Sequence, residues 1–484
     1  MWIDFLRLHA QRIPQHPALI FDESGETLTY TDLDRQASQW AAQLHREGVG
    51  KGDRVAYLGP NCLHHLTLFF GCAKLGAIFV PLNLRLADSE LATQLDWIEP
   101  KRFYGSGGRL GCREPHDFSE SAPLEYPETE IHMDDVLMIL FTSGSTGEPK
   151  GVMLHAGMLL WNAINTCMDW GLFPSDRSVL QMPFFHTGGY NVICLPLLRL
   201  GGTLVMCNGF DPDQTLAVIQ RHRITVYFAV PTMFRMMQEA PSFARSDFST
   251  VRACISGGAP IPASLIAAYR DQGVPLKQGF GLTEVGPNCF TMTDEEALSR
   301  PDSVGRPMPH SAMRLVDEAG QPVKRGEVGE LAIKGPHVCK GYWGSAALFA
   351  QSFRDGFFHT GDLMRQDEEG FFYVAGRRKD MYISGGENVY PGEVMRQLVQ
   401  HPRVLDAVVL PVADEKWGEV GAAFLRTQTP LTLDELRRFL DDRLSRYKHP
   451  HYLFCLDNFP LLPNNKVDMK ALAAMAAERL GRNA

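Results

Sequence analysis

Several features that would assign the chain to a familiar protein class are missing from its 484 residues. None of the ten cysteines forms a Cys-x-x-Cys pair, so neither a zinc site nor a disulfide framework is predicted. No apolar run approaches the roughly 18 residues of a membrane span. The formal charge is −9, so nucleic acid is not an expected partner. A reduced cytoplasm is the simplest compartment to expect.

The order of apolar and amphipathic stretches predicts an α/β protein. Strands are expected at Val55–Leu58, Ala77–Pro81, Leu204–Cys207, Val226–Val230, Ala253–Ile255 and Leu276–Gln278, with helical stretches between them and one helix at 62–75. Such alternation predicts βαβ units and largely parallel sheets, in which ligands bind at the carboxyl ends of the strands. Basic residues spaced among apolar ones over Met1–Leu19 predict an amphipathic helix and not a secretory signal.

A change in composition and hydrophobic pattern near Ser303 predicts the domain organisation. Residues 303–345 are rich in Gly and Pro with short alternating runs, which indicates a small antiparallel barrel or sheet. A polar run then follows Gly376. We expect a large N-terminal domain at 1–376 whose 303–376 part is β-rich and barrel-like. A hinge at 377–379 and a small, mobile α+β C-terminal domain at 380–484 are expected to follow.

A segment rich in glycine and hydroxyl groups follows the apolar strand Val136–Phe141. Residues 142–151 read Thr-Ser-Gly-Ser-Thr-Gly-Glu-Pro-Lys-Gly. Glycines let backbone N–H groups approach phosphate oxygens, hydroxyls add donors, and a lysine adds positive charge. The spacing is not that of a Walker A loop. The candidate phosphate ligands are Thr142, Ser143, Gly144, Ser145, Thr146, Gly147 and Lys150.

This segment resembles the signature of the adenylate-forming superfamily. That superfamily includes acyl- and aryl-CoA synthetases, adenylation domains of peptide synthetases, and firefly luciferase. Further family motifs follow in family order, so the resemblance extends over essentially the whole chain. The acyl-CoA synthetase branch is the most similar.

Two motifs resemble the adenine, acyl and magnesium sites of the family. In the segment 278–284, Gln278, Gly279 and Phe280 match the adenine site, and Phe280 stands where the family usually has Tyr. Thr283 is expected to hydrogen-bond the α-phosphate, and Glu284 is expected to bind Mg²⁺. The second motif follows Ser256 and supplies Gly257, Gly258, Ala259 and Pro260, where bare backbone suits a flat ligand.

The ribose motif and the hinge motif come next in the chain. Asp362, in His-Thr-Gly-Asp, resembles the carboxylate that accepts from both ribose hydroxyls. Arg377 matches the arginine that reaches ribose and phosphate, and Lys379 matches the pivot between the domains. Gly385 and Gly386 match the strand that lines the pantetheine tunnel.

Near its end the chain carries a match to the lysine that serves adenylation, Lys466. The residue before it, Asn465, stands where the family usually has Gly. Asparagine tolerates left-handed backbone angles better than other non-glycine residues, so the turn is compatible with this change.

The segment Phe184-Phe185-His186-Thr187-Gly188-Gly189 resembles the aromatic gate of acyl-CoA synthetases, with His186 as its candidate functional residue. Amino-acid adenylation domains usually carry Asp near this histidine to pair with the substrate amine. Its absence favours a carboxylic acid without an α-amino group. With Ala229 and Gly258 expected nearby, an apolar acyl or aryl acid is predicted.

The resemblance implies a two-step reaction with ATP, Mg²⁺ and coenzyme A. The acid would form an acyl-AMP with release of pyrophosphate, and the acyl group would then pass to coenzyme A after the small domain turns about Lys379. A carrier-protein thiol or an amine is an alternative acceptor. A luciferase-like oxygenase and a non-catalytic nucleotide-binding relative are more distant alternatives. A homodimer is compatible with the sequence.

Overall fold

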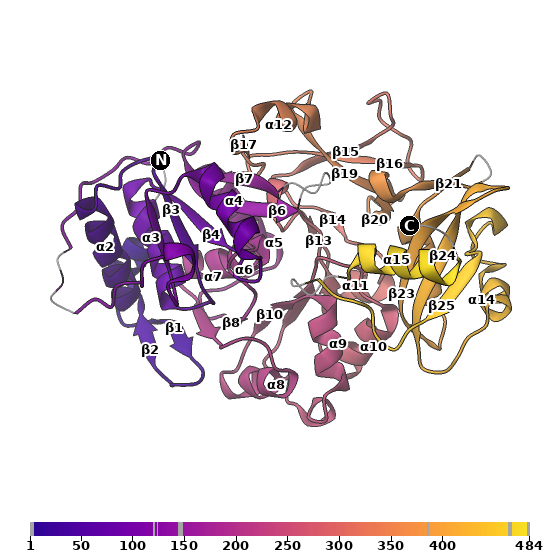
Figure 1. The fold of residues 1–484 in the computed structure, drawn as a ribbon. Helices are drawn as coiled ribbons and strands as arrows, with labels where there is room; N and C mark the ends of the chain where they lie inside the picture. The colour runs from indigo at the N-terminus through magenta and orange to yellow at the C-terminus, as the bar shows by residue number, and fades with distance from the viewer. Residues whose placement is uncertain are drawn as a thin grey trace.

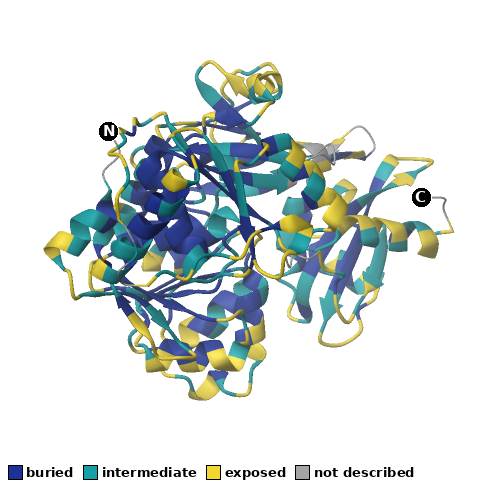
Figure 2. Ribbon diagram, turned by 60° about the vertical axis from the view of Figure 1, so that its left-hand side comes forward, coloured by how far each residue is buried: buried dark blue, intermediate teal, exposed yellow. Residues whose placement is uncertain are grey.

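The computed structural model describes residues 4–119, 122, 124–143, 149–384, 387–462 and 467–481, with the backbone alone at Ser143, Lys379 and Asn388. A large N-terminal domain and a smaller C-terminal domain lie side by side (Figure 1). Buried residues gather in the sheets and in the helices packed against them, while exposed residues lie on the outer helix faces and loops (Figure 2). None of the described helices is long and apolar enough to cross a membrane.

The first sheet of the N-terminal domain has six strands in the order β17-β7-β6-β4-β3-β5. They are β3 (Arg54–Leu58), β4 (Ile78–Leu82), β5 (Arg102–Gly105), β6 (Val136–Ser143), β7 (Pro149–His155) and β17 (Gly341–Tyr342). β3 to β6 are parallel, whereas β7 and β17 run antiparallel to their neighbours. The nearby helices are α2 (Tyr30–Arg46), α3 (Leu63–Leu75), α4 (Asp88–Ile98) and α5 (Ala156–Asp169). α3 is buried along most of its length because most of its side chains are apolar and its buried Lys74 pairs with Asp4 and Asp34.

Two further parallel arrays complete the α/β part. One has the order β2-β1-β9-β8, with β1 (Pro17–Phe21), β2 (Thr27–Thr29), β8 (Arg177–Leu180) and β9 (Thr203–Met206), where only the β1–β2 pair is antiparallel. The other is wholly parallel and consists of β10 (Val226–Ala229), β11 (Ala253–Ser256) and β12 (Leu276–Gln278). Their helices are α6 (Thr187–Tyr190), α7 (Cys194–Leu200), α8 (Pro212–Arg221), α9 (Pro231–Glu239) and α10 (Ala263–Asp271).

The N-terminal helix is shorter than the sequence predicted. α1 covers Phe5–Arg12, and β1 begins at Pro17. Ile13 already has non-helical backbone angles. Pro14 disfavours the helical conformation for the residue before it, which explains the stop. Residues 17–19, expected in the helix, instead pair with β2 and β9.

The β-rich part is an antiparallel sheet of five strands. It consists of β15 (Ala312–Val316), β16 (Val328–Lys334), β18 (Phe353–Arg354), β19 (Phe357–Gln366) and β20 (Phe372–Arg377). The short pair β13 (Phe290–Thr291) and β14 (Arg306–Pro307) and the helices α11 (Asp294–Ser299) and α12 (Ala346–Ser352) lie around it. The change in composition near Ser303 therefore coincides with a change from parallel to antiparallel strand pairing.

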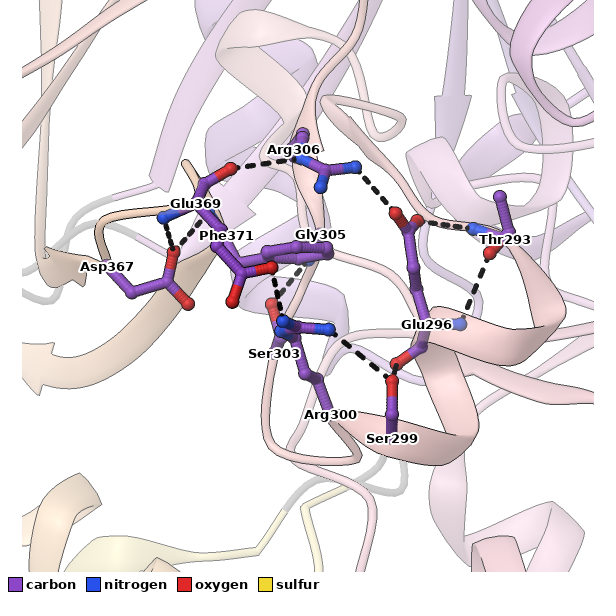
Figure 3. Close-up of polar contacts among 10 residues, drawn as sticks. All are labelled: Thr293, Glu296, Ser299, Arg300, Ser303, Gly305, Arg306, Asp367, Glu369 and Phe371. Carbon is purple, nitrogen blue, oxygen red and sulfur yellow. Dashed lines mark hydrogen bonds and ion pairs between the residues drawn. The ribbon is translucent and has the colours of Figure 1, made fainter.

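An arginine pair fixes the turn between β19 and β20 to α11. The guanidinium carbons of Arg300 and Arg306 lie 4.4 and 3.9 Å from the centroid of the Phe371 ring, on its two faces (Figure 3). Arg300 pairs with Glu369 at 2.5 Å, and Arg306 pairs with Glu296 at 2.6 Å. These contacts hold α11 against the turn that connects β19 to β20. β19 carries the ribose motif, and β20 carries the start of the hinge motif.

The C-terminal domain is a five-stranded sheet with helices on both faces. Its strands are β21 (Tyr382–Ser384), β22 (Glu387–Val389), β23 (Val404–Asp414), β24 (Gly418–Thr427) and β25 (Tyr452–Cys455), and its helices are α13 (Pro391–Leu398), α14 (Leu433–Leu440) and α15 (Met469–Arg479). Separate apolar clusters form on the two faces, one under α13 and α14 and the other under α15. The mixed α/β fold predicted from the sequence is confirmed.

Two ion pairs among the described residues join the domains. Arg235 and Glu239 lie one turn apart on α9, and Asp406 and Arg426 face each other on β23 and β24. Arg235 Nη2 is 3.7 Å from Asp406 Oδ2, and Arg426 Nη2 is 4.0 Å from Glu239 Oε1. One face of a helix therefore meets a cross-strand pair of opposite charges.

Candidate functional site

The first part of the site is the β6–β7 hairpin. Thr142 on β6 pairs with Lys150 on β7, so these two ends of the predicted phosphate loop are neighbours. The ammonium of Lys150 lies 5.0 Å from the ring centroid of Tyr342, which is on the adjacent strand β17. The ring face thus holds the charge near the hairpin mouth. Gly144, Ser145, Thr146 and Gly147 lie outside the described residues.

Tyr342 also contacts the predicted magnesium ligand. Its hydroxyl donates a hydrogen bond to Glu284 Oε1 at 3.1 Å. The carbonyl of Glu284 accepts from the N–H of Cys339 at 2.7 Å, which holds the short helical turn Thr283–Val285 against the segment before β17. Burial and the neighbouring carboxylate raise the pKa of the Tyr342 phenol, so it stays a donor. Lys150, Tyr342 and Glu284 form what we call the Tyr342 group.

Neither the family motifs nor sequence spacing identified Tyr342. It lies 58 residues after Glu284 and far from Lys150 in the chain. A two-residue strand brings it beside both, and the sequence carries no strand signal of that length.

The loops after β11 and β12 lie side by side, as the carboxyl ends of neighbouring parallel strands should. The N–H of Gly279 donates to the carbonyl of Ser256 at 2.7 Å. The Gln278 side chain accepts from the N–H of Ile261 at 3.0 Å, which ties the second loop to the first. Gly258 has φ +88°, a conformation that favours glycine, and Gly258, Ala259 and Pro260 are exposed. The predicted adenine and acyl motifs are therefore brought together.

The ring of Phe280 packs against the core of the β-rich part. It lies edge-on to Phe290 with ring centroids 5.7 Å apart. Gly281 follows it in a position that admits no side chain, because a Cβ there would lie 2.2 Å from the carbonyl oxygen of Pro287. This close approach fixes the backbone between Phe280 and Thr283.

The ribose motif has a geometry that fits a diol ligand. Asp362 on β19 is 3% exposed, and its Oδ1 accepts from Arg377 Nε on β20 at 2.9 Å. Its Oδ2 is buried and has no hydrogen-bond partner among the described residues. Burial raises the pKa of the Asp362 carboxyl, and Arg377 opposes that shift. A buried acceptor without a donor is costly, so a ligand hydroxyl would satisfy it.

Both arginines that begin the hinge motif are held by carboxylates of the β-rich sheet. While Arg377 pairs with Asp362, Arg378 Nη1 lies 3.2 Å from Glu330 Oε2. Glu330 is itself buried and accepts from the N–H of Gly361 at 3.0 Å. Lys379 follows in a short helical turn, Arg378–Asp380. Glu330 is a second residue that the motifs did not identify.

In the segment predicted as an aromatic gate, the two phenylalanines are buried and the histidine is half-buried. Phe184 is fully buried and stacks on Tyr190 at 4.4 Å, so it is a core residue. Phe185 is buried as well. His186 is the residue before α6 and is half-buried, with its ring 4.7 Å from that of Phe185.

Ala229 is fully buried and packs into the cluster that contains Met233 and Phe234, so its expected lining role stays a prediction. Its neighbour Phe228 faces the other way, since successive strand residues point to opposite faces. Every residue of β10 is buried, so no polar alternation in the sequence could have shown which face was which.

No three His, Cys, Asp or Glu side chains of the described residues gather to hold a metal ion on their own. A single carboxylate such as Glu284 fits Mg²⁺ that takes its other ligands from phosphates and water. Gly385 and Gly386, predicted for the pantetheine tunnel, and Lys466, predicted for adenylation, lie outside the described residues. Their roles stay predictions.

The family models match this chain over both domains. The AMP-binding enzyme family matches residues 6–343, and the AMP-binding enzyme C-terminal domain matches residues 393–466. A feruloyl-CoA synthase from an Amycolatopsis species is 39% identical over 456 residues, which cover 92% of this chain and 93% of that protein. An indoleacetate–CoA ligase from Aromatoleum aromaticum is 35% identical over 98% of both chains.

A solved structure extends the similarity to three dimensions. The o-succinylbenzoate coenzyme A synthetase from Bacillus subtilis, in complex with ATP and magnesium ion, superposes with a TM-score of 0.82 at 31% identity. The match covers 96% of this chain and 98% of that one. The chain belongs to the AMP-binding enzyme family, which confirms the resemblance inferred from its motifs. Within that family it is an AMP-forming acyl-CoA synthetase, an acid–thiol ligase.

Proposed function

We propose that the protein activates an aromatic or other apolar carboxylic acid with ATP and Mg²⁺ and transfers the acyl group to coenzyme A. The observation that carries the proposal is that two groups of residues in the structure suit different parts of ATP. The Tyr342 group supplies a cation and a carboxylate for phosphates and metal. Asp362 supplies a buried, unsatisfied acceptor for ribose. A feruloyl-CoA synthase and an indoleacetate–CoA ligase among the relatives favour an aryl acid.

The first half-reaction needs no protein nucleophile. The carboxylate oxygen of the acid attacks the α-phosphorus, the bond from phosphorus to the bridging oxygen breaks, and pyrophosphate leaves. The Lys150 ammonium and the Thr142 and Thr283 hydroxyls would offset negative charge on the phosphates. Glu284 would hold Mg²⁺, which supplies further charge neutralisation when bound. Gly257 to Pro260 and Gln278 to Phe280 would cradle the adenine.

The second half-reaction requires another arrangement of the domains, because pyrophosphate must leave before a thiol enters. In the structure, the C-terminal sheet is held against α9 by the Arg235–Asp406 and Arg426–Glu239 ion pairs. We assign this arrangement to adenylation, with Lys466 as its expected lysine. A turn about Lys379, the hinge between domains at 1–376 and 380–484, would bring Gly385 and Gly386 to the acyl-AMP. The sulfur then attacks the acyl carbon and AMP leaves.

The cytoplasm is the compartment that fits this proposal. All ten cysteines are free thiols, as expected of a reducing environment. A homodimer is the proposed assembly, and the molar mass in solution would test it. A carrier-protein thiol is the alternative acceptor.

The proposed function is tested with a panel of acids and two acceptors. Pyrophosphate release should depend on the acid and on Mg²⁺, and aryl acids should exceed amino acids. Adding coenzyme A should yield the thioester with loss of the free thiol. Pyrophosphate release without thioester formation, together with acylation of a pantetheinylated carrier protein, would assign the acceptor to the carrier. No pyrophosphate from any acid would exclude an adenylating enzyme.

A further inference from the structure

The Phe228 ring lies between two glycines that belong to separate segments of the site. A Cβ at Gly257, in the loop after β11, would be 3.7 Å from Phe228 Cε2. A Cβ at Gly188, in α6, would be 3.4 Å from Phe228 Cε1. These ring carbons lie on opposite edges of the ring. One edge therefore faces the loop assigned to the adenine and acyl groups, and the other faces the segment after His186.

A narrow apolar cavity lies on the Gly188 side of the ring. Its walls come from β8, β9, α6 and α7 and from Phe228 itself, and the lining residues are Val179, Leu180, Met182, Gly188, Gly189, Ile193, Cys194, Leu204 and Phe228. None of these side chains carries a charge. Phe228 thus belongs both to this cavity and to the wall next to Gly257, whereas Gly188 lines the cavity.

Phe228 is well placed to separate the two spaces. It is 9% exposed, and of the described residues that line the cavity it is the only aromatic one. Gly188 and Gly257 offer no side chains that would take its place. Replacing the ring by a smaller side chain would connect the Gly257 surface with the cavity behind it. An apolar ligand could then extend into the volume that the ring vacates, which adjoins a cavity with room for about one water molecule.

We propose that Phe228 closes the inner end of the acyl site and sets the length of the acid that the enzyme accepts. The proposal rests on the proposed function, because it places the acyl group against Gly257. It names the substrate class more closely as acids whose apolar part is compact, such as a single ring with a short linker. Acids with a long apolar extension along the same axis are excluded by the ring.

The experiment measures pyrophosphate release for acids of increasing length in Phe228→Leu and Phe228→Ala. Two series serve, straight-chain acids and benzoic acids with para-alkyl groups. One methylene in an apolar pocket changes discrimination by about tenfold or more. We therefore expect the preferred length to move upward in both series. The ratio of kcat/KM for a longer acid to that for the shortest should rise at least tenfold, and more in Phe228→Ala than in Phe228→Leu.

Phe234→Leu is the matched control. Phe234 is a fully buried phenylalanine in the cluster on the opposite face of β10, where its ring packs against Tyr227. It should lose stability as Phe228→Leu does but keep the wild-type order of acids. A second control adds Gly188→Val to Phe228→Ala, since a side chain at this helical position points toward the vacated ring. This double variant should return the preference toward short acids.

The outcomes separate this inference from the proposed function. Folded Phe228 variants that release pyrophosphate with an unchanged order of acids would overturn the role of Phe228 and leave adenylation intact. The same shift in Phe234→Leu would also overturn it, because a general loosening would then be the cause. If Phe228→Ala fails to fold, Phe228→Leu decides. Absence of pyrophosphate release from the wild-type protein would instead reject the proposed function.

Discussion

The Tyr342 hydroxyl donates to Glu284 Oε1 at 3.1 Å while the Tyr342 ring faces the ammonium of Lys150. One side chain thus orients both the carboxylate proposed for the metal and the cation proposed for the phosphates. Its two contacts use different parts of the tyrosine, so they can be removed separately.

Tyr342→Phe should weaken the use of Mg·ATP without loss of the fold. The hydroxyl is removed, but the ring remains beside Lys150. A hydrogen bond to a charged group contributes about 1.5–3 kcal/mol, so the Mg²⁺ needed for half-maximal pyrophosphate release should rise roughly tenfold or more. Tyr373→Phe is the matched control, because Tyr373 donates to Asp367 at 2.9 Å in the turn between β19 and β20. Equal effects of the two changes would remove Tyr342 from the site.

Asp362→Asn should weaken ATP binding without lowering the stability of the fold. Burial raises the folded pKa of Asp362, with Arg377 opposing and Glu284 and Asp380 adding to the rise. The folded state then holds the proton more tightly than the unfolded state, so the charged carboxylate lowers stability at neutral pH. The variant should therefore melt no lower than wild type at pH 7 while its KM for ATP rises about tenfold or more. A lower melting temperature with unchanged KM would contradict the ribose assignment.

The raised pKa of Asp362 also predicts that the KM for ATP increases on the acid side of the pH profile. As pH falls through the folded pKa, the ionised acceptor is lost, so the KM of the wild-type protein for ATP should increase. It should do so at a higher pH than an ordinary aspartate would produce. Protonation of Asp362 adds stability in the same pH window, so its contributions to the melting temperature and to the KM should both rise as pH falls. The Asp362→Asn variant should lack this limb, and an identical limb in both proteins would place its origin elsewhere.

Gly281→Ala and Gly257→Ala should behave differently although both glycines lie in site loops. A Cβ at Gly281 would be 2.2 Å from the Pro287 oxygen and 2.3 Å from its carbon, and rigid backbone cannot yield cheaply. We expect a loss of about 1–3 kcal/mol in unfolding free energy. A Cβ at Gly257 would lie 3.6 Å from the Gly279 oxygen, an ordinary contact. Gly257→Ala should fold normally yet reduce turnover, as denaturant unfolding and pyrophosphate release would show.

Lys379→Pro should uncouple the half-reactions. Proline fixes φ near −65° and removes the N–H, so it restricts the backbone rotation of a hinge. If the chain rests in the adenylating arrangement, acyl-AMP should form in a single-turnover burst while transfer to coenzyme A falls by a much larger factor. Lys379→Ala is the control, because it removes the same side chain and leaves the backbone free to rotate. Wild-type melting with undiminished thioester formation would exclude Lys379 as the hinge.

Features carried by continuous sequence could be predicted, and features made by packing could not. Apolar runs such as Val226–Val230 predicted strands at the right places, and the hairpin after Val136 carried its own glycine and lysine signals. Tyr342 was missed because a two-residue strand leaves no periodicity. Phe228 was missed because a strand buried on both faces shows no alternation that would mark one residue as facing a ligand.

The ion pairs between α9 and the C-terminal sheet make the attachment of the two domains to each other sensitive to salt. Glu239 and Arg426 are separated by 4.0 Å and have 50% and 20% of their side chains exposed, so mobile ions screen this pair readily. Arg235 is 11% exposed and Asp406 33%, so ions reach the second pair less easily. Rising ionic strength should therefore release the outer pair first and the inner pair later. The two pairs would therefore open one after the other while α13 stays against β20, where Arg396 donates a hydrogen bond to the Val374 carbonyl.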